Sequence, residues 1–101
     1  MTGPVSKGYW VARVDVANAE AYDRYRALNG IAFEKFGGRF LVRGPAGKVA
    51  KGVARAHNVV LEFPDYDAAL ACYNSPEYQA AKVHLDQVGE IDLVILPGFA
   101  G

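Results

Sequence analysis

The segment at residues 71–79, Ala-Cys-Tyr-Asn-Ser-Pro-Glu-Tyr-Gln, constrains the fold of this chain more than any other. One helical pattern ends within it and another begins at Ser75-Pro76, because serine caps helices and proline is tolerated at the first helical position. The apolar, strand-like residues 58–63 come just before it. A strand followed by a helix also occurs in the first half of the chain, so the sequence predicts two strand–helix–strand units.

The first unit begins at residues 8–16, where apolar side chains alternate as in a strand with two unequal faces. Asn18 is placed to cap a helix, whose apolar positions recur at helical spacing until Gly37-Gly38 ends it. Residues 39–43 form the second predicted strand, and a hairpin-like excursion follows to residue 55. Within the helix, Gly30 costs roughly 1 kcal/mol relative to alanine, so we expect a kink or a close contact there.

The second unit begins with the strand at residues 58–63, after which Asp65 is placed to cap a helix. The helical pattern restarts at Ser75-Pro76 and closes at Gly89. A fourth strand is predicted at residues 91–96.

Two units in this order favour an antiparallel sheet, because right-handed crossovers place their helices on the same side. The predicted fold is α+β: a ferredoxin-like βαββαβ domain with a four-stranded antiparallel sheet and two helices on one face. A chain of 101 residues, 51% of them apolar, suffices for one hydrophobic core. We therefore expect a single domain over residues 1–101, with its core at about 8–98.

Helices on one side leave the other face of the sheet uncovered, and the pattern keeps that face partly apolar. Its predicted apolar residues are Tyr9, Val11, Leu41 or Val42, and Val60. An exposed apolar patch of this kind marks an interaction surface. A homodimer that packs sheet against sheet would cover it with one self-complementary surface.

Charge and hydropathy exclude two classes of partner. Eleven basic and eleven acidic residues leave no net charge, so the sequence lacks the basic footprint of a nucleic-acid-binding protein. The apolar runs are far shorter than the roughly 20 residues that cross a bilayer. We expect neither nucleic acid nor membrane as a partner.

The first seven residues lack the apolar core of a secretory signal. The single cysteine cannot form an internal disulfide. Both features predict a cytoplasmic protein.

Four motifs resemble a known family: Gly8-Tyr9-Trp10, residues 37–44 (GGRFLVRG), residues 59–64 (VVLEFP) and residues 72–79 (CYNSPEYQ). Together they are similar to the family of domain of unknown function 1330 over residues 8–98. The resemblance implies a fold like that of the dimeric α/β-barrel proteins, which include antibiotic-biosynthesis monooxygenases, haem-degrading enzymes and stress-induced proteins. It implies a ferredoxin-like protomer and a homodimer, and it implies no reaction.

His57, just before the third predicted strand, is the candidate catalytic residue, since histidine exchanges protons near neutral pH. The alternative is a partly exposed residue at the strand entrance. Arg39 and Arg43 are expected on one face of the second strand, where arginine could hold a carboxylate through two parallel hydrogen bonds. Salt bridges between subunits would explain them equally, but Arg43 adjoins a Gly-Pro loop and is the candidate ligand contact.

Four tyrosines fall on the predicted helices at Tyr22, Tyr25, Tyr73 and Tyr78. Together with Trp10 they would line a cavity between helices and sheet that suits a flat organic ligand, although aromatic filling of the core is the alternative. From this set Tyr22, Tyr73 and Trp10 are the candidate ligand-binding residues.

No metal or cofactor is expected, because the two histidines and the cysteine lie far apart and no phosphate-binding glycine motif occurs. Two functions remain open. One is a cofactor-independent enzyme, of monooxygenase or isomerase type, acting on a small aromatic or carboxylated metabolite. The other is a non-catalytic ligand-binding or stress-associated protein. An RNA-binding domain of the same topology is disfavoured, because residues 58–63 lack the pattern of stacking aromatics and basic residues that such domains need on the third strand.

Overall fold

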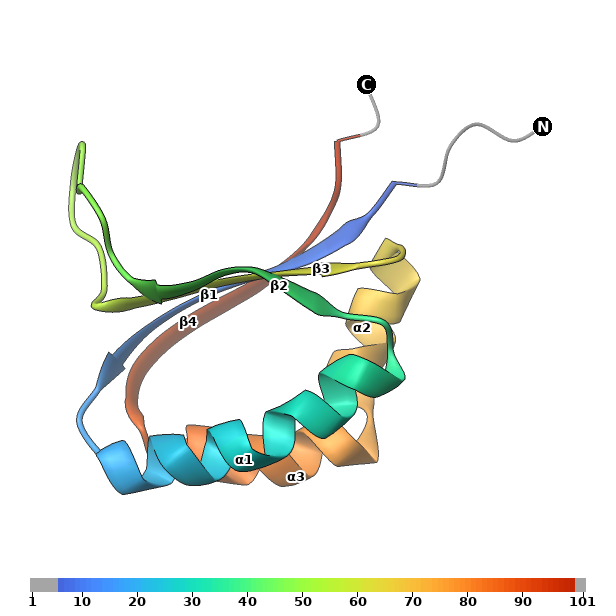
Figure 1. Ribbon diagram of the computed structural model, residues 1–101, viewed down its shortest axis with the longest axis horizontal. Helices are drawn as coiled ribbons and strands as arrows, with labels where there is room; N and C mark the ends of the chain where they lie inside the picture. Colours follow the sequence, from blue (N-terminus) through green and yellow to red (C-terminus); the bar gives the residue numbers. More distant parts are fainter. Residues whose placement is uncertain (1–5, 100–101) are drawn as a thin grey trace.

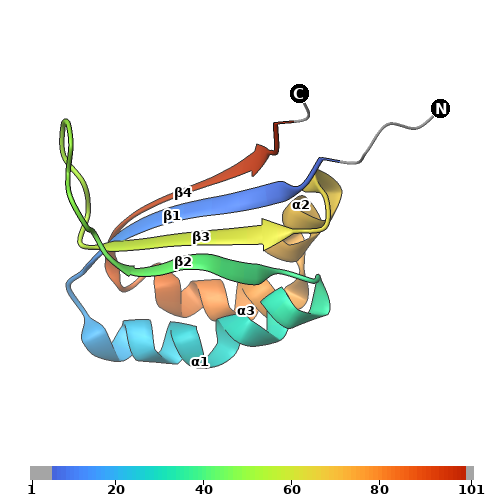
Figure 2. The ribbon, with the colours of Figure 1, turned by 45° about the horizontal axis from the view of Figure 1, so that its top comes forward.

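The computed structural model describes residues 6–99. The elements follow the order β1 (Gly8–Val16), α1 (Ala19–Lys35), β2 (Arg39–Pro45), β3 (His57–Phe63), α2 (Tyr66–Asn74), α3 (Pro76–Leu85) and β4 (Gly89–Pro97). All strand pairs are antiparallel, and the strands lie in the order β2-β3-β1-β4 (Figures 1 and 2). This is the ferredoxin-like arrangement that the sequence predicts.

All helices lie on one side of the sheet, and no other element covers the opposite side among the described residues (Figure 1). Three helices occur instead of two, because the second predicted helical region is interrupted at Ser75. Ser75 Oγ donates to the carbonyl of Cys72 at 2.7 Å and accepts from the amide of Tyr78 at 3.1 Å. One buried hydroxyl thus ends α2 and caps α3.

The other predicted caps are confirmed. Asn18 accepts from the amide of Ala21 at 3.1 Å, and Asp65 accepts from the amide of Ala68 at 2.7 Å. Each side chain satisfies an amide that has no partner within its helix, which fixes where α1 and α2 begin.

Trp10 is the centre of the core, with 2% of its surface exposed. Its indole N–H donates to the carbonyl of Ala69 at 2.9 Å, which joins β1 to α2. Rings from α1, β3 and α3 pack around it: Phe33 at 5.3 Å, Phe63 at 5.5 Å and Tyr78 at 4.8 Å between ring centroids. The layer between sheet and helices is therefore built on one aromatic cluster.

A β-bulge at Leu41 reverses part of the predicted face of β2. Arg39 pairs with Glu62 and Phe40 with Leu61, but Val42 pairs with Val60. The extra residue moves everything after it to the opposite face of the sheet. The expectation that Arg39 and Arg43 share a face is therefore wrong: Arg39 lies on the uncovered face, whereas Arg43 lies on the helix side.

Two further local expectations need correction. His57 is the first residue of β3 and pairs with Val14, so it lies within the strand instead of before it. Gly30 makes no close contact, because a Cβ added there would meet nothing within 4 Å.

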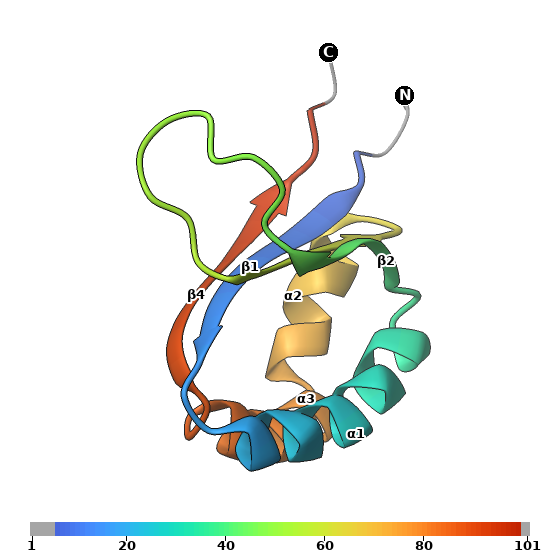
Figure 3. The same ribbon diagram turned by 60° about the vertical axis from the view of Figure 1, so that its left-hand side comes forward.

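The long connection between β2 and β3, residues 46–56, rises on the uncovered side of the sheet (Figure 3). No helix among residues 6–99 is long and apolar enough to cross a membrane. Residues 1–5, which hold most of the segment inspected for a secretory signal, and residues 100–101 lie outside the described residues.

Gly89, the first residue of β4, allows the backbone conformation at the start of this strand to be tested by mutation. Its φ of +150° lies in a region that favours glycine, and an added Cβ would collide with the carbonyl of Asp15. We expect Gly89→Ala to lower the free energy of unfolding by about 2 kcal/mol or more in urea titrations followed by circular dichroism. The matched control is Gly30→Ala, which should raise it by up to about 1 kcal/mol because of alanine's higher helix propensity. Equal effects of the two substitutions would contradict this account.

Candidate functional site

A cavity lies between the sheet and the helices, bounded by α1 and α3 on one side and by all four strands on the other. Its volume is about 40 Å³, which is room for two or three water molecules. Most of its wall is apolar, with Ala12, Val14, Val59, Leu61, Ile91 and Leu93 contributed by the strands. A ligand larger than a few waters therefore enters only if side chains of the wall move.

The open side of the cavity lies between α1 and the edge strand β2. Arg26 and Arg43 both line the cavity and are exposed to solvent, so they mark its mouth. Phe40 also lines it with 37% of its surface exposed, and the guanidinium carbon of Arg43 lies 4.5 Å from the centroid of its ring. The stacked Phe40–Arg43 pair thus forms a wall segment on β2, which is an edge strand of the sheet.

The interior carries a pair of phenols. The hydroxyls of Tyr25 on α1 and Tyr78 on α3 are 2.9 Å apart, and both side chains are buried. Burial raises the pKa of Tyr25 to about 12 and also raises the pKa of Tyr78, so both are neutral at physiological pH. Asn29, one helical turn after Tyr25, is also buried and lines the cavity. The interior therefore offers uncharged hydrogen-bonding groups.

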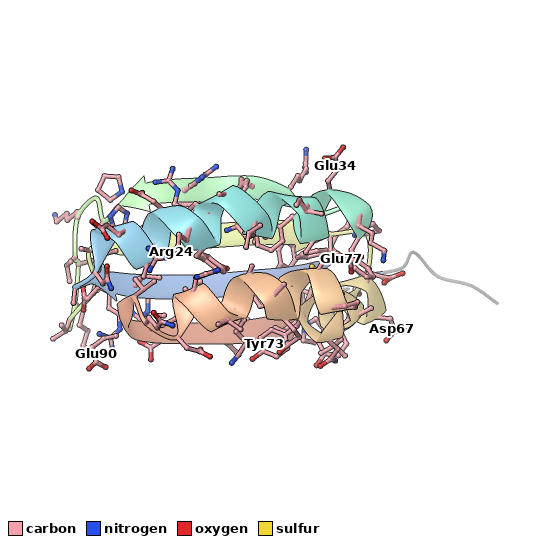
Figure 4. All side chains as sticks on the ribbon, turned by 90° about the horizontal axis from the view of Figure 1, so that it is seen from below. Arg24, Glu34, Asp67, Tyr73, Glu77 and Glu90 are labelled. Atoms are coloured by element: carbon pink, nitrogen blue, oxygen red, sulfur yellow. The ribbon has the colours of Figure 1, made fainter. Side chains whose placement is uncertain are left out.

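The structure brings together three of the five predicted site residues. Trp10, Tyr22 and Arg43 all line the cavity. Tyr73 does not; it packs behind Trp10 and Tyr78, with ring centroids 6.0 Å and 5.4 Å away, and Figure 4 shows it toward the β4 side of the helices. His57 is not among the lining residues, but its ring centroid lies 5.6 Å from that of Tyr22, on the helix side of the sheet.

Two polar residues of the cavity wall, Asn29 and Arg26, escaped the sequence interpretation. Asn29 follows Tyr25 at helical spacing, and a polar residue in an apolar stripe is the signal that could have identified it. Arg26 lies one turn after Tyr22, and its guanidinium carbon is 5.5 Å from the centroid of that ring. Charged residues follow tyrosines by chance in many helices, so no sequence signal singles out Arg26.

The residues that line the cavity offer only a few kinds of ionisable group. Its ionisable residues are three tyrosines and two arginines, with no carboxylate or imidazole among them. Such a set can bind an anion and donate hydrogen bonds.

Cys72 lies nearby but is buried, which raises its thiol pKa to about 12 and keeps it protonated. Within residues 6–99 no group of three or more His, Cys, Asp or Glu side chains is placed to hold a metal ion.

The uncovered face of the sheet is a second feature of interest, because its side chains are ordered in rows. The central row contains one valine from each strand: Val42, Val60, Val11 and Val94, in the order of the strands. The outer two are 48% and 47% exposed. A continuous apolar stripe therefore crosses the whole sheet.

A polar row lies on one side of this stripe. Glu62 accepts hydrogen bonds from the hydroxyl of Tyr9 and from Nε of Arg39, each at 3.0 Å. These donors, the Tyr9 hydroxyl first, lower the pKa of Glu62, and the carboxylate in turn raises the pKa of Tyr9.

The other flank is organised by Arg55, which comes from the long loop. Its guanidinium donates to Asp15 at 2.8 Å and to Asp92 at 2.7 Å, and Asp15 also accepts from the amide of Ala56. These bonds lower the pKa of both carboxyls, with the Ala56 amide the largest cause at Asp15 and Arg55 the largest at Asp92. Arg55 thus ties the base of the loop to β1 and β4.

Solved structures share this fold at low sequence identity. The protein RPA0582 of unknown function from Rhodopseudomonas palustris is 23% identical, with a TM-score of 0.72 over 95% of this chain and 85% of that one. SnoaB, a cofactor-independent oxygenase from Streptomyces nogalater, is 13% identical, with a TM-score of 0.67 over 96% and 97% of the two chains. A dimeric protein of unknown function and ferredoxin-like fold from Bacteroides fragilis is 12% identical, with a TM-score of 0.60 over 90% and 95%. These likenesses show the fold alone.

No curated protein matches the sequence. A family model does match it, and that match extends from residue 7 to residue 99, which is nearly all of the chain. The protein therefore belongs to the family of domain of unknown function 1330 (DUF1330).

Proposed function

We propose that this protein is a homodimer that binds a small aromatic or carboxylated metabolite in the cavity between α1 and the sheet. One observation carries the proposal: an apolar, aromatic cavity opens at a mouth that holds two arginines, Arg26 and Arg43. Concave, mostly apolar sites with a few polar groups are typical of small-molecule binding. Arginine adds a planar donor pair that suits a carboxylate.

Binding requires the mouth to widen. The cavity holds only two or three waters as it stands, and Phe40 and Arg43 are the wall residues with the most freedom, since they lie on an exposed edge strand. A ligand carboxylate would draw Arg43 away from the Phe40 ring. Phe40 would then pack on the face of the ligand instead.

The proposed dimer forms through the uncovered face of the sheet. The stripe of four valines would supply an apolar centre, and the ion-paired rows on either side would form a polar rim, which is the usual anatomy of an interface. The Bacteroides fragilis protein of the same fold is dimeric, which supports this assembly. The two proposed surfaces occupy opposite faces of one sheet.

Catalysis is the second candidate function. SnoaB has the same fold and is a cofactor-independent oxygenase, which favours a related activity. His57 is the proposed general base. Its ring centroid lies 5.6 Å from that of Tyr22, which lines the cavity, so the imidazole would reach a ligand that lies beside Tyr22. A non-catalytic ligand-binding or stress-associated protein is the alternative, supported by the lack of a base among the lining residues.

Replacing Arg43 tests the cavity. We expect Arg43→Gln to weaken binding of 2-naphthoate about tenfold or more, because a charged hydrogen bond to the carboxylate is lost. Isothermal titration calorimetry measures the Kd. The control is Arg24→Gln, which removes an exposed arginine of α1 that does not line the cavity (Figure 4) and should leave the Kd unchanged. Equal affinity of wild type and Arg43→Gln would place the ligand elsewhere.

Native mass spectrometry tests the dimer. The wild type should give a species of about 22 kDa, twice the 10.9 kDa of one chain. Val94→Asp should shift it to the monomer, because a charge would be buried without a partner at the interface. Val83→Asp is the matched control: this valine of α3 is 58% exposed, against 47% for Val94, and lies away from the sheet. A Val94→Asp variant that remains dimeric would exclude the sheet face as the interface.

Oxygen consumption tests the catalytic candidate. With 1,4-dihydroxy-2-naphthoate as an electron-rich aromatic acid, an oxygenase should consume oxygen faster than the buffer alone. His57→Ala should then reduce the protein-dependent rate by roughly 100-fold, the usual contribution of a general base, while Kd for 2-naphthoate changes little. An unaltered rate in His57→Ala would remove His57 from the mechanism.

A further inference from the structure

The Tyr25–Tyr78 pair in the interior of the cavity carries an inference about the ligand itself. Both residues line the cavity, and their hydroxyls are 2.9 Å apart. Tyr78 is fully buried and Tyr25 is 9% exposed. A hydroxyl pair this deep in an apolar wall is costly to build unless every proton finds an acceptor.

Counting protons shows what the pair lacks. Two neutral hydroxyls carry two protons, and the bond between them uses one, whichever oxygen donates. The side chain of Asn29 also hydrogen-bonds Tyr25 and lowers its pKa, as a donor to the phenol oxygen does, so it takes up neither of the two protons. One O–H therefore remains for whatever occupies the cavity, and that occupant must accept a hydrogen bond.

The neighbours of the pair favour an acceptor over a donor. Burial keeps both phenols protonated, so neither presents an anionic oxygen that would attract a cation. The cavity wall contains no carboxylate, and its charged residues are the arginines at the mouth. An uncharged acceptor such as a carbonyl oxygen suits the interior, whereas an anionic group suits the mouth.

The strand register gives the approximate length of the ligand. Arg43 on β2 lies in one row with Val59 on β3 and Ala12 on β1, and Trp10, whose ring is 4.8 Å from that of Tyr78, is two residues before Ala12. Two strand spacings across the sheet and two residues along β1 amount to about 12 Å on the diagonal. A molecule with one ring or two fused rings spans this distance once the reach of the arginine side chain is taken into account.

We propose that the site takes a flat one- or two-ring molecule that carries a carboxylate at the Arg43 end and a carbonyl oxygen, hydrogen-bonded by the Tyr25–Tyr78 pair, at the other. This inference rests on the proposed function, because it assigns a ligand class to the same cavity. It adds the orientation of the bound ligand: the carbonyl group lies in the interior of the cavity and the carboxylate remains at the mouth. A phenol donor on a carbonyl also polarises it, which would serve either recognition or the stabilisation of an enolate.

Two probes of equal shape test the proposal: 6-acetyl-2-naphthoate, and 6-isopropenyl-2-naphthoate, in which a methylene group replaces the carbonyl oxygen. Calorimetric Kd values of the wild type should favour the acetyl probe by about five- to tenfold, the worth of one hydrogen bond. The double variant Tyr25→Phe/Tyr78→Phe should bind both probes equally. The matched control, Tyr66→Phe on α2, keeps the preference, because Tyr66 does not line the cavity.

The isopropenyl probe also reports on folding, since its affinity should be the same in all variants. If the double variant does not fold, Tyr25→Phe takes its place and should reduce the preference to less than half of the wild-type ratio. Equal affinity of the two probes for the wild type would overturn this inference and leave the proposed cavity intact. Failure of both probes to bind the wild type would overturn the proposed function together with the inference.

Discussion

The rest of the structure depends on the hydrogen bond from the Trp10 indole to the carbonyl of Ala69. It joins the central strand β1 to α2 inside the buried layer, where an N–H without a partner costs about 1–3 kcal/mol. It also fixes the plane of the indole. Phe33, Phe63 and Tyr78 then meet that ring edge-on or tilted, in geometries that each add about 0.5–1.5 kcal/mol beyond burial. A single oriented ring thereby sets the spacing of the two layers.

The cavity follows from that spacing. Large rings around Trp10 hold α1 and α3 away from the sheet, and the Tyr25–Tyr78 hydroxyl pair joins the two helices at 2.9 Å. Toward the other end of the sheet the wall residues are smaller, including Ala12 and Val59, so they do not fill the space that the rings create. The opening remains at β2, because a strand at the edge of the sheet has no neighbour to cover it.

Sequence reasoning predicts the elements well, because each boundary has a local chemical cause. Asn18, Asp65 and Ser75 cap their helices through bonds to amides three residues ahead. The bulge at Leu41 has no such signature, and its consequence is large: without it Arg43 would face away from the helices. Arg43 lines the cavity only because of this bulge, and its role as a ligand contact stays a prediction. Tyr73 was misplaced because helical spacing alone does not tell which side of the Trp10 cluster a ring will occupy.

The strict alternation along β1 separates two surfaces that share one backbone. Trp10, Ala12 and Val14 face the helices, whereas Tyr9, Val11 and Arg13 face the uncovered side. Substitutions on one face leave the side chains of the other in place, so assembly and ligand binding are separable by mutation. The bulge in β2 is the exception that connects them, since a regular pairing of Leu41 with Val60 would shift every later residue of β2 by one and turn Arg43 from the cavity to the uncovered face. In the proposed homodimer, a second subunit packed against Val42 would stabilise this strand register. It would thereby keep Arg43 at the mouth of the cavity.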